Sequence, residues 1–335
     1  MLRGEFRPWG SLSWVLAHLR AKKWSLLGCI ATGERCLAAW EILASQRVLT
    51  HALMMEIHDE HPDGGRHSRF YEKTEAKLKN RMRDFVTAGG NKDQIAKFYL
   101  SDFHGRIVDA TDSFAAGAGS NVIIDISALP KRFFFPMIRR LLSAGSIENL
   151  IATYSVPDRY ADGQLAEDPG PWMYLPTFLP PDPEPEEKVL IVGLGYEPLG
   201  LRQVLQGKDF NLLFPFPSLS PGIRRNWEFV RELIPLLRHE PQRVYIYDVS
   251  ETYERIAAMT DFGRRYAVVA PYGPKTTSLA MCLYAVSDRA SLSPPAVYYT
   301  QPRVYNPDYS IGIKKEGGVP KVLAYCLRLG GRNLY

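Results

Sequence analysis

The sequence predicts an α/β protein built from two Rossmann-like halves, each a three-layer α/β/α arrangement around a mostly parallel sheet, related by internal duplication. Three observations predict this fold class. Short apolar runs alternate with longer amphipathic segments along the chain, which is the pattern of successive βα units. A segment rich in proline and acidic residues interrupts this alternation near the middle of the chain. Similar residues also recur in the same order on either side of that segment.

Length and composition agree with a folded two-domain protein. The chain has 335 residues, of which 46% are hydrophobic and 23% are charged. No apolar run approaches the roughly 20 residues that cross a bilayer, so we expect a cytoplasmic protein without a membrane span. The net charge of +5 is a mild excess and does not indicate direct nucleic-acid binding. Buried thiols in a reducing compartment are expected for the four dispersed cysteines, Cys29, Cys36, Cys282 and Cys326.

Residues 1–24 form a basic extension with interleaved apolar residues, among them Trp14, Val15 and Leu16. A targeting peptide would need a clean apolar stretch and a small-residue cleavage site, which this segment lacks. We therefore expect a short amphipathic helix packed on the first domain. The first Rossmann-like domain would follow over residues 25–167.

Residues 168–187 read DPGPWMYLPTFLPPDPEPEE, and their prolines exclude a regular helix. We expect a semi-rigid linker whose aromatic first part packs on one domain. Residues 188–335 would then form the second Rossmann-like domain.

The alternating pattern places five strands and three or four helices in each half. The expected strands are 26–31, 51–57, 96–101, 121–126 and 149–155, then 189–193, 211–215, 243–247, 266–270 and 296–300. The expected helices are 35–45, 69–87 and 132–143, then 199–205, 225–237, 251–259 and 276–287.

The recurring residues fall just beyond the expected strands, where open parallel sheets bind their ligands. Helix N-termini in that position direct backbone N–H groups at anions. The matched positions pair Gly33 and Glu34 with Gly195 and Glu197, Arg69 with Arg225, Asp102 with Asp248, and Lys131 with Lys275. Together with Ser127, Gly273, Thr276 and Thr277, these residues form the predicted ligand-binding set.

The most distinctive turn reads APYGPKTTSLAM, residues 270–281. Lys275 supplies a positive charge, and the following hydroxyl residues could either contact a phosphate or cap the helix. The turn lacks the spacing of a Walker loop, and the GLG of residues 193–195 is equally consistent with a tight strand-to-helix turn. Ser127 is interpreted as a cap, because no GxSxG motif surrounds it.

A cluster of histidines and acids in EIHDEHPDGGRH offers an alternative kind of site. His58, His61 and His67 could hold a divalent metal, or the segment could be a solvated loop. The corresponding stretch of the second half contains no metal ligands, which favours the loop. We expect no cofactor.

The strand, Pro-Lys turn and apolar helix in ISALPKRFF and APYGPKTTSLAM resemble the CRISPR-associated Rossmann-fold (CARF) sensor domains. Two such halves in one chain resemble SAVED domains. The resemblance implies that a cyclic oligonucleotide messenger of antiviral signalling binds in the cleft between the halves, with Lys131 and Lys275 on its phosphates. The chain departs from CARF domains in having proline where they prefer threonine.

Our leading hypothesis is thus a non-enzymatic sensor module that binds a nucleotide or oligonucleotide and signals to a protein partner carrying an effector activity. Two alternatives stay open. One is a hydrolase of nucleotides or nucleic acid, using the histidine cluster or the carboxylates of Glu34 and Glu197. The other is a scaffold subunit whose halves bind no ligand.

Overall fold

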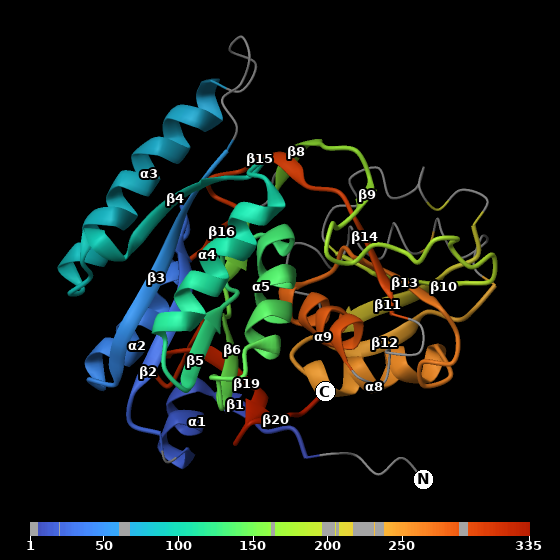
Figure 1. The fold of residues 1–335 in the computed structure, drawn as a ribbon. Helices are drawn as coiled ribbons and strands as arrows, with labels where there is room; N and C mark the ends of the chain where they lie inside the picture. The colour runs from blue at the N-terminus through green and yellow to red at the C-terminus, as the bar shows by residue number, and fades with distance from the viewer. Residues whose placement is uncertain are drawn as a thin grey trace. The chain divides into compact units, whose positions relative to one another are not determined.

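The computed structural model divides the chain into two compact units (Figure 1). It describes residues 6–19, 21–59, 68–161, 165–195, 205, 208–216, 231, 238–287 and 294–335. Unit 1 comprises Met1–Glu167 and Arg303–Leu334, and unit 2 comprises Asp168–Pro302 with Tyr335. In the described part of the chain, no helix combines the length and the apolar character needed to cross a membrane.

Unit 1 is built on an eight-stranded sheet in the order β1-β19-β6-β5-β2-β3-β4, with β20 added beside β19. The strands β2 to β6 are mutually parallel, whereas β19 is antiparallel to both β6 and β1. Their bounds are β1 Trp9–Ser11, β2 Trp24–Ile30, β3 Leu49–His58, β4 Ile95–Tyr99, β5 Asn121–Asp125, β6 Asn149–Ser155, β19 Val322–Leu329 and β20 Arg332–Asn333.

Helices cover both faces of this sheet (Figure 1). On one face, α1 (Leu12–His18), α2 (Ala38–Ser45) and α3 (Ser68–Thr87) share a core with β2, β5 and β19. On the other face, α4 (His104–Gly117) packs beside α5 (Lys131–Ser143). The expected amphipathic helix at the N-terminus is therefore confirmed as α1, which buries Leu12, Val15 and Leu16. The short 3-10 helices η1 (Glu34–Leu37) and η2 (Lys92–Gln94) precede α2 and β4.

Unit 2 repeats the same plan with a six-stranded sheet in the order β12-β11-β10-β13-β14-β9. The first five are parallel, and β9 is antiparallel to β14. Two helices, α8 (Val249–Met259) and α9 (Lys275–Val286), pack against each other. The strands are β9 Met173–Tyr174, β10 Val189–Gly193, β11 Asn211–Phe216, β12 Gln242–Tyr245, β13 Ala267–Pro271 and β14 Ala296–Tyr299.

The remaining strands form small two-stranded sheets. β15 pairs with β8, β16 with β7, and β17 with β18. Their bounds are β7 Arg159–Tyr160, β8 Ala166–Pro169, β15 Pro302–Tyr305, β16 Ser310–Ile311, β17 Lys315–Glu316 and β18 Val319–Pro320.

The fold class predicted from the sequence is confirmed. Each of the ten expected strands is present with ends within two residues of the prediction. When the five parallel strands of each unit are numbered along the chain, starting from β2 in unit 1 and β10 in unit 2, both sheets have the order third-second-first-fourth-fifth. This shared order is what an internal duplication predicts. Central strands such as β2 and β13 are buried along their whole length, as parallel strands covered on both faces must be. The expected helices 199–205 and 225–237 lie outside the described residues, apart from Leu205 and Arg231.

The domain boundaries differ from the prediction in two places. Residues 303–334 belong to unit 1 rather than to the second domain, because β19 pairs with β6 from Val322↔Ser155 onward. Residues 168–187 are part of unit 2 and not a separate linker, because β9 joins its sheet. Trp172 and Tyr174 pack against the core of that unit, as the aromatic residues of this segment led us to expect.

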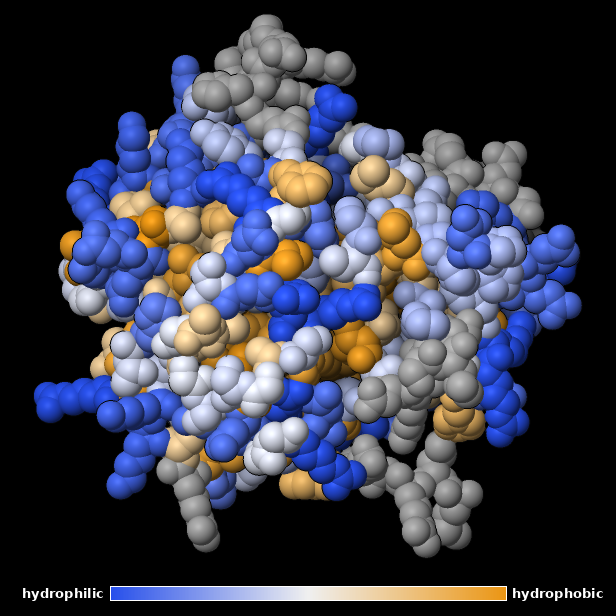
Figure 2. Space-filling view, in the orientation of Figure 1, coloured by the Kyte–Doolittle hydropathy of each residue, from blue (hydrophilic) through white to orange (hydrophobic). Residues whose placement is uncertain are grey.

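The cysteines are buried and free, as expected. On the face drawn in Figure 2, hydrophilic side chains lie outermost and apolar residues show in separate places between them.

Candidate functional site

The strand order defines one candidate site in each unit. In a sheet ordered third-second-first-fourth-fifth, ligands bind where the first and fourth strands end side by side. In unit 1 these strands are β2 and β5, and in unit 2 they are β10 and β13. The predicted residues Gly33, Ser127 and Lys131 follow the first pair, and Gly195 and Lys275 follow the second. The structure therefore brings them to the switch point of each sheet.

The two Pro-Lys turns are built alike. Pro130 caps α5 and Pro274 caps α9, so that Lys131 and Lys275 are the first residues of their helices. Both lysines are partly buried, and burial lowers the pKa of Lys131 to about 7. Each lysine thus lies where backbone N–H groups of a helix N-terminus also favour negative charge.

The residue after each lysine fastens the turn that follows the third strand. Arg132 donates from Nη1 to Leu100 O at 3.0 Å, and Thr276 donates from its hydroxyl to Ile246 O. Leu100 and Ile246 occupy equivalent positions in the two units. The backbone N–H of Leu100 donates to His58 O, and that of Ile246 donates to Phe216 O, each at 2.9 Å. The repeat seen in the sequence therefore extends to individual hydrogen bonds.

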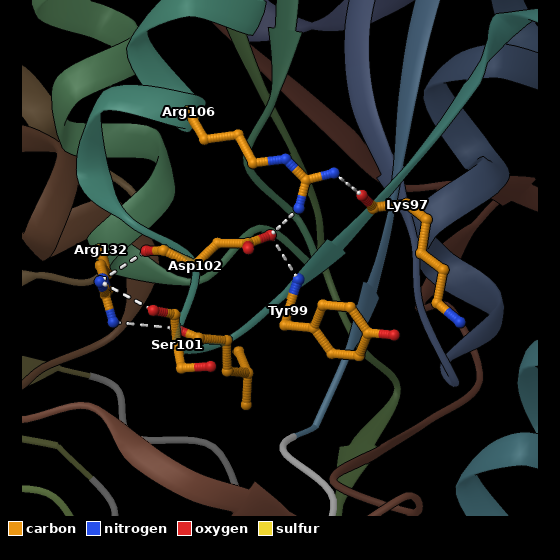
Figure 3. Close-up of polar contacts among 7 residues, drawn as sticks. Lys97, Tyr99, Ser101, Asp102, Arg106 and Arg132 are labelled. Atoms are coloured by element: carbon orange, nitrogen blue, oxygen red, sulfur yellow. Dashed lines mark hydrogen bonds and ion pairs between the residues drawn. The ribbon is translucent and has the colours of Figure 1, made fainter.

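Asp102 and Asp248 stabilise these turns. Figure 3 shows Asp102 Oδ2 accepting from the backbone N–H of Tyr99 at 2.7 Å and from Arg106 Nη1 at 2.6 Å. In the same view Arg132 reaches across from α5 to the carbonyl of Asp102. Asp248 accepts from Glu251 N at 2.8 Å and so caps α8. Both carboxylates are committed to local structure, which differs from the predicted ligand contact.

The hydroxyl groups of the predicted set are also turned inward. Ser127 is fully buried, donates to Asp125 and accepts from Ser155 N at 2.7 Å. Ser127 does not cap α5, whose N-cap residue is Pro130, so its interpretation as a cap is wrong, and its hydroxyl links Asp125 to the backbone of Ser155 instead. Thr276 and Thr277 are each 1% exposed, and Thr277 Oγ1 has no hydrogen-bond partner in the described part of the chain. Neither hydroxyl is presented at the surface for a phosphate, contrary to the expectation for this turn.

The glycines of the unit 2 turns allow a close approach between two loops. A Cβ atom on Gly195 would lie 2.1 Å from Tyr272 O, and one on Gly273 would lie 2.8 Å from Leu194 O. These contacts involve backbone atoms, which leave no room for a side chain. The tight-turn interpretation of the GLG sequence is supported by this geometry.

The histidine cluster is only partly described. His58 lies between two carboxylates, with Nδ1 at 3.0 Å from Glu75 Oε1 and Nε2 at 3.2 Å from Glu56 Oε1. Within the described residues, no group of three or more histidine, cysteine, aspartate or glutamate side chains could hold a metal ion. His61, His67, Glu197, Arg225 and the side chain of Arg69 lie outside what the structure describes.

Sequence reasoning missed Arg35, which directly follows Gly33 and the exposed Glu34. Its guanidinium is buried at the switch point of unit 1, whereas most arginines are exposed. A basic residue in the turn after the first strand was a signal that could have been used. Its contacts with Ser155 and Ser310 join residues far apart in sequence, so they could not be foreseen.

Comparison with known proteins adds little to this picture. No family model matches the chain, and no curated protein matches it. Among solved structures, a universal stress protein from Archaeoglobus fulgidus DSM 4304 is similar at 10% identity and a TM-score of 0.23, over 83% of this chain and 96% of the other. An assigned universal stress protein of Pseudomonas aeruginosa UCBPP-PA14 is similar at 15% identity and the same TM-score, over 83% and 93%. At these TM-scores neither likeness bears on function.

Proposed function

We propose that the chain is a binding module for nucleotide-type ligands, in which Lys131 contacts phosphate at the switch point of unit 1 and Lys275 contacts phosphate at that of unit 2. One observation carries the proposal: the same lysine-bearing turn stands at the switch point of both sheets, at the first residue of a long helix. An ammonium group at a helix N-terminus, at the carboxyl edge of a parallel sheet, suits an anionic ligand. A module of this kind acts as a sensor, and the proposal includes a separate partner protein that carries the effector activity.

The resemblance to CARF and SAVED domains, modules of antiviral signalling, supports cyclic oligonucleotides as the first ligands to test. The panel would hold cyclic di-, tri- and tetra-adenylate, ATP and AMP. Binding is measured as the rise in melting temperature and, for any positive compound, by calorimetric titration. We expect the wild-type chain to be stabilised by at least one member of the panel.

The lysines are tested by Lys131→Ala, Lys275→Ala and their combination, with the exposed Lys92→Ala as the matched control. Each lysine-phosphate contact is a hydrogen bond to charged groups and contributes about 1.5–3 kcal/mol, so each single change should weaken binding roughly tenfold or more. Calorimetry near pH 7 should also show proton uptake on binding, because a phosphate beside Lys131 raises a pKa that burial has lowered to about 7. Stabilisation that survives the double change would refute the proposed contacts.

A further inference from the structure

Arg35 is a buried cation at the end of β2, and it is distinct from the lysine turns. It is 5% exposed. Nε donates to Ser310 Oγ at 3.0 Å, and Nη1 donates to Ser155 O over a long 3.4 Å. Among the described residues no carboxylate lies within 4 Å of its guanidinium, and Nη2 donates to none of them. Burial of a guanidinium without a carboxylate in direct contact is costly, so this arrangement calls for an explanation.

Arg328 of the same unit shows what a purely structural buried arginine looks like. It is 8% exposed, and all three of its nitrogens donate. Nη1 contacts Ala144 O at 2.8 Å and Ile147 O at 3.0 Å, Nε contacts Asn333 Oδ1 at 2.7 Å, and Nη2 contacts Leu142 O. Arg35 has two neutral acceptors, one of them distant. Its donor capacity is therefore only partly used.

Hydroxyl groups lie close to Arg35, and one acid also acts on it. Burial opposes the charge of Arg35, but the nearby tyrosines and Asp125 favour it, and its pKa is raised. The Tyr154 ring lies 5.7 Å from its guanidinium carbon, and the Tyr154 hydroxyl lies 3.2 Å from that of Tyr160. Tyr309 packs edge-on against Tyr160, with ring centroids 5.7 Å apart. Burial raises the pKa of Tyr160 well above its ordinary value, so its hydroxyl keeps its proton. A guanidinium surrounded by phenol and serine hydroxyls is suited to an oxyanion.

Residues 306–311, which we call the strap, lie over this position. β16 within the strap pairs with β7, with Ser310 opposite Tyr160. A Cβ atom on Gly33 would lie 3.3 Å from Ser310 Oγ, so the strap contacts the turn that follows β2. Asp308 anchors the strap to α3 through Lys73 and through Lys77, whose Nζ lies 2.5 Å from Asp308 Oδ1. The chain thus closes its own switch point in unit 1.

We propose that Arg35 binds a phosphate group in unit 1 and that the phosphate displaces Ser310 Oγ from the guanidinium, which releases the strap. A phosphate oxyanion can make two parallel hydrogen bonds to a guanidinium, and in these bonds both partners are charged. Exchange of neutral acceptors for phosphate also places a negative charge in direct contact with the guanidinium, which Asp125 does not do. The site uses neither Lys131 nor Lys275, so it goes beyond the function proposed above.

Inorganic phosphate is the probe, titrated into the full chain at constant ionic strength with chloride as the reference. Binding is measured by calorimetry, and strap release is measured by hydrogen exchange of peptides that cover residues 305–313. We expect saturable binding together with faster exchange in the strap. Sulfate should act similarly, whereas acetate should not if the site selects a tetrahedral oxyanion. A wild-type chain that shows neither phosphate binding nor a change in strap exchange overturns the proposal.

Variants separate a binding role from a purely structural one. Arg35→Lys keeps the charge without the fork and should bind phosphate at least tenfold more weakly, and Arg35→Gln should not bind it. Ser310→Ala removes the competing acceptor, so phosphate should bind a few-fold more tightly, which a merely structural Arg35 would not produce. Arg328→Lys is the matched control and should lower the melting temperature without changing phosphate affinity. If Arg35→Gln does not fold, Arg35→Lys and Ser310→Ala decide the matter.

The double variant of Lys131 and Lys275 should keep the phosphate-dependent rise in strap exchange, because that readout reports on Arg35 and Ser310 and not on the lysine turns. The two proposals can therefore fail separately. Loss of nucleotide binding in the lysine double variant tests the proposed function, and loss of phosphate binding in Arg35→Lys tests the site at Arg35. Equal phosphate affinity in wild type, Arg35→Lys and Ser310→Ala would overturn the assignment to Arg35.

Discussion

Replacement of Arg328 by methionine tests how the C-terminal strand β19 is held in unit 1. Methionine keeps much of the apolar stem but removes the donors that reach Leu142 at the end of α5 and Ala144 and Ile147 in the connection to β6. Hydrogen bonds to a charged group contribute about 1.5–3 kcal/mol each, but those of one side chain do not add fully. Burial also lowers the pKa of Arg328, which shows that the charged form bears a desolvation cost. We expect a net loss of about 3 kcal/mol in the free energy of unfolding.

The assay is urea denaturation followed by hydrogen exchange with peptide resolution. Peptides from β19 and β6 should lose protection in Arg328→Met, because these strands are direct neighbours. Arg303→Met changes an exposed arginine in the same terminal segment and should alter stability by less than about 0.5 kcal/mol. A loss below about 1 kcal/mol in Arg328→Met, with unchanged exchange in β6, would show that this arginine does not fasten the strand.

Two further predictions concern α4 and unit 2. His104 begins α4, and neither of its ring nitrogens has a hydrogen-bond partner among the residues that the structure describes. Burial and, as a smaller cause, the charge of Arg132 lower its pKa. Since the unfolded chain binds the proton more readily, stability should fall as the pH drops below about 6.5, by up to roughly 1.4 kcal/mol per pH unit, and His104→Phe should remove this component. An identical pH profile in both proteins would contradict the reasoning. Gly195→Ala should destabilise unit 2 by about 2 kcal/mol, because its Cβ would meet Tyr272 O at 2.1 Å, while Gly145→Ala, with open space around it, should be nearly neutral in the same denaturation assay. Equal stability of the two glycine variants would argue against the close approach of the loops.

Much of the fold follows from local pattern. Parallel strands that are covered on both faces are continuous apolar runs, so β2, β5 and β13 could be located from hydrophobicity alone. The helix α4 was missed although Ile107, Thr111 and Phe114 form a buried stripe, because small and polar residues dilute its amphipathic pattern. The strand β19 was not predicted, and its residues were assigned to the second domain because its partner β6 is remote in sequence.

The candidate site was predictable in place but not in detail. The rule that ligands bind beyond the ends of parallel strands located the turns that carry Lys131 and Lys275. It could not show that Asp102 and Ser127 accept hydrogen bonds from the backbone of Tyr99 and Ser155, because these contacts depend on the folded positions of the residues. The unpaired charge of Arg35 was hidden for the same reason, because Ser310 reaches it from the opposite end of the chain.

The central claim, that this chain binds a phosphate-bearing nucleotide through its lysine turns, is tested most directly by equilibrium ligand capture. The purified chain is incubated with the nucleotide panel, separated by ultrafiltration and denatured, and the released small molecules are measured by mass spectrometry. We predict that the wild type and Lys92→Ala retain the same nucleotide in stoichiometric amount, and that the double alanine variant of Lys131 and Lys275 retains little of it. Retention of no nucleotide by the wild type, or equal retention by the double variant, would contradict the account.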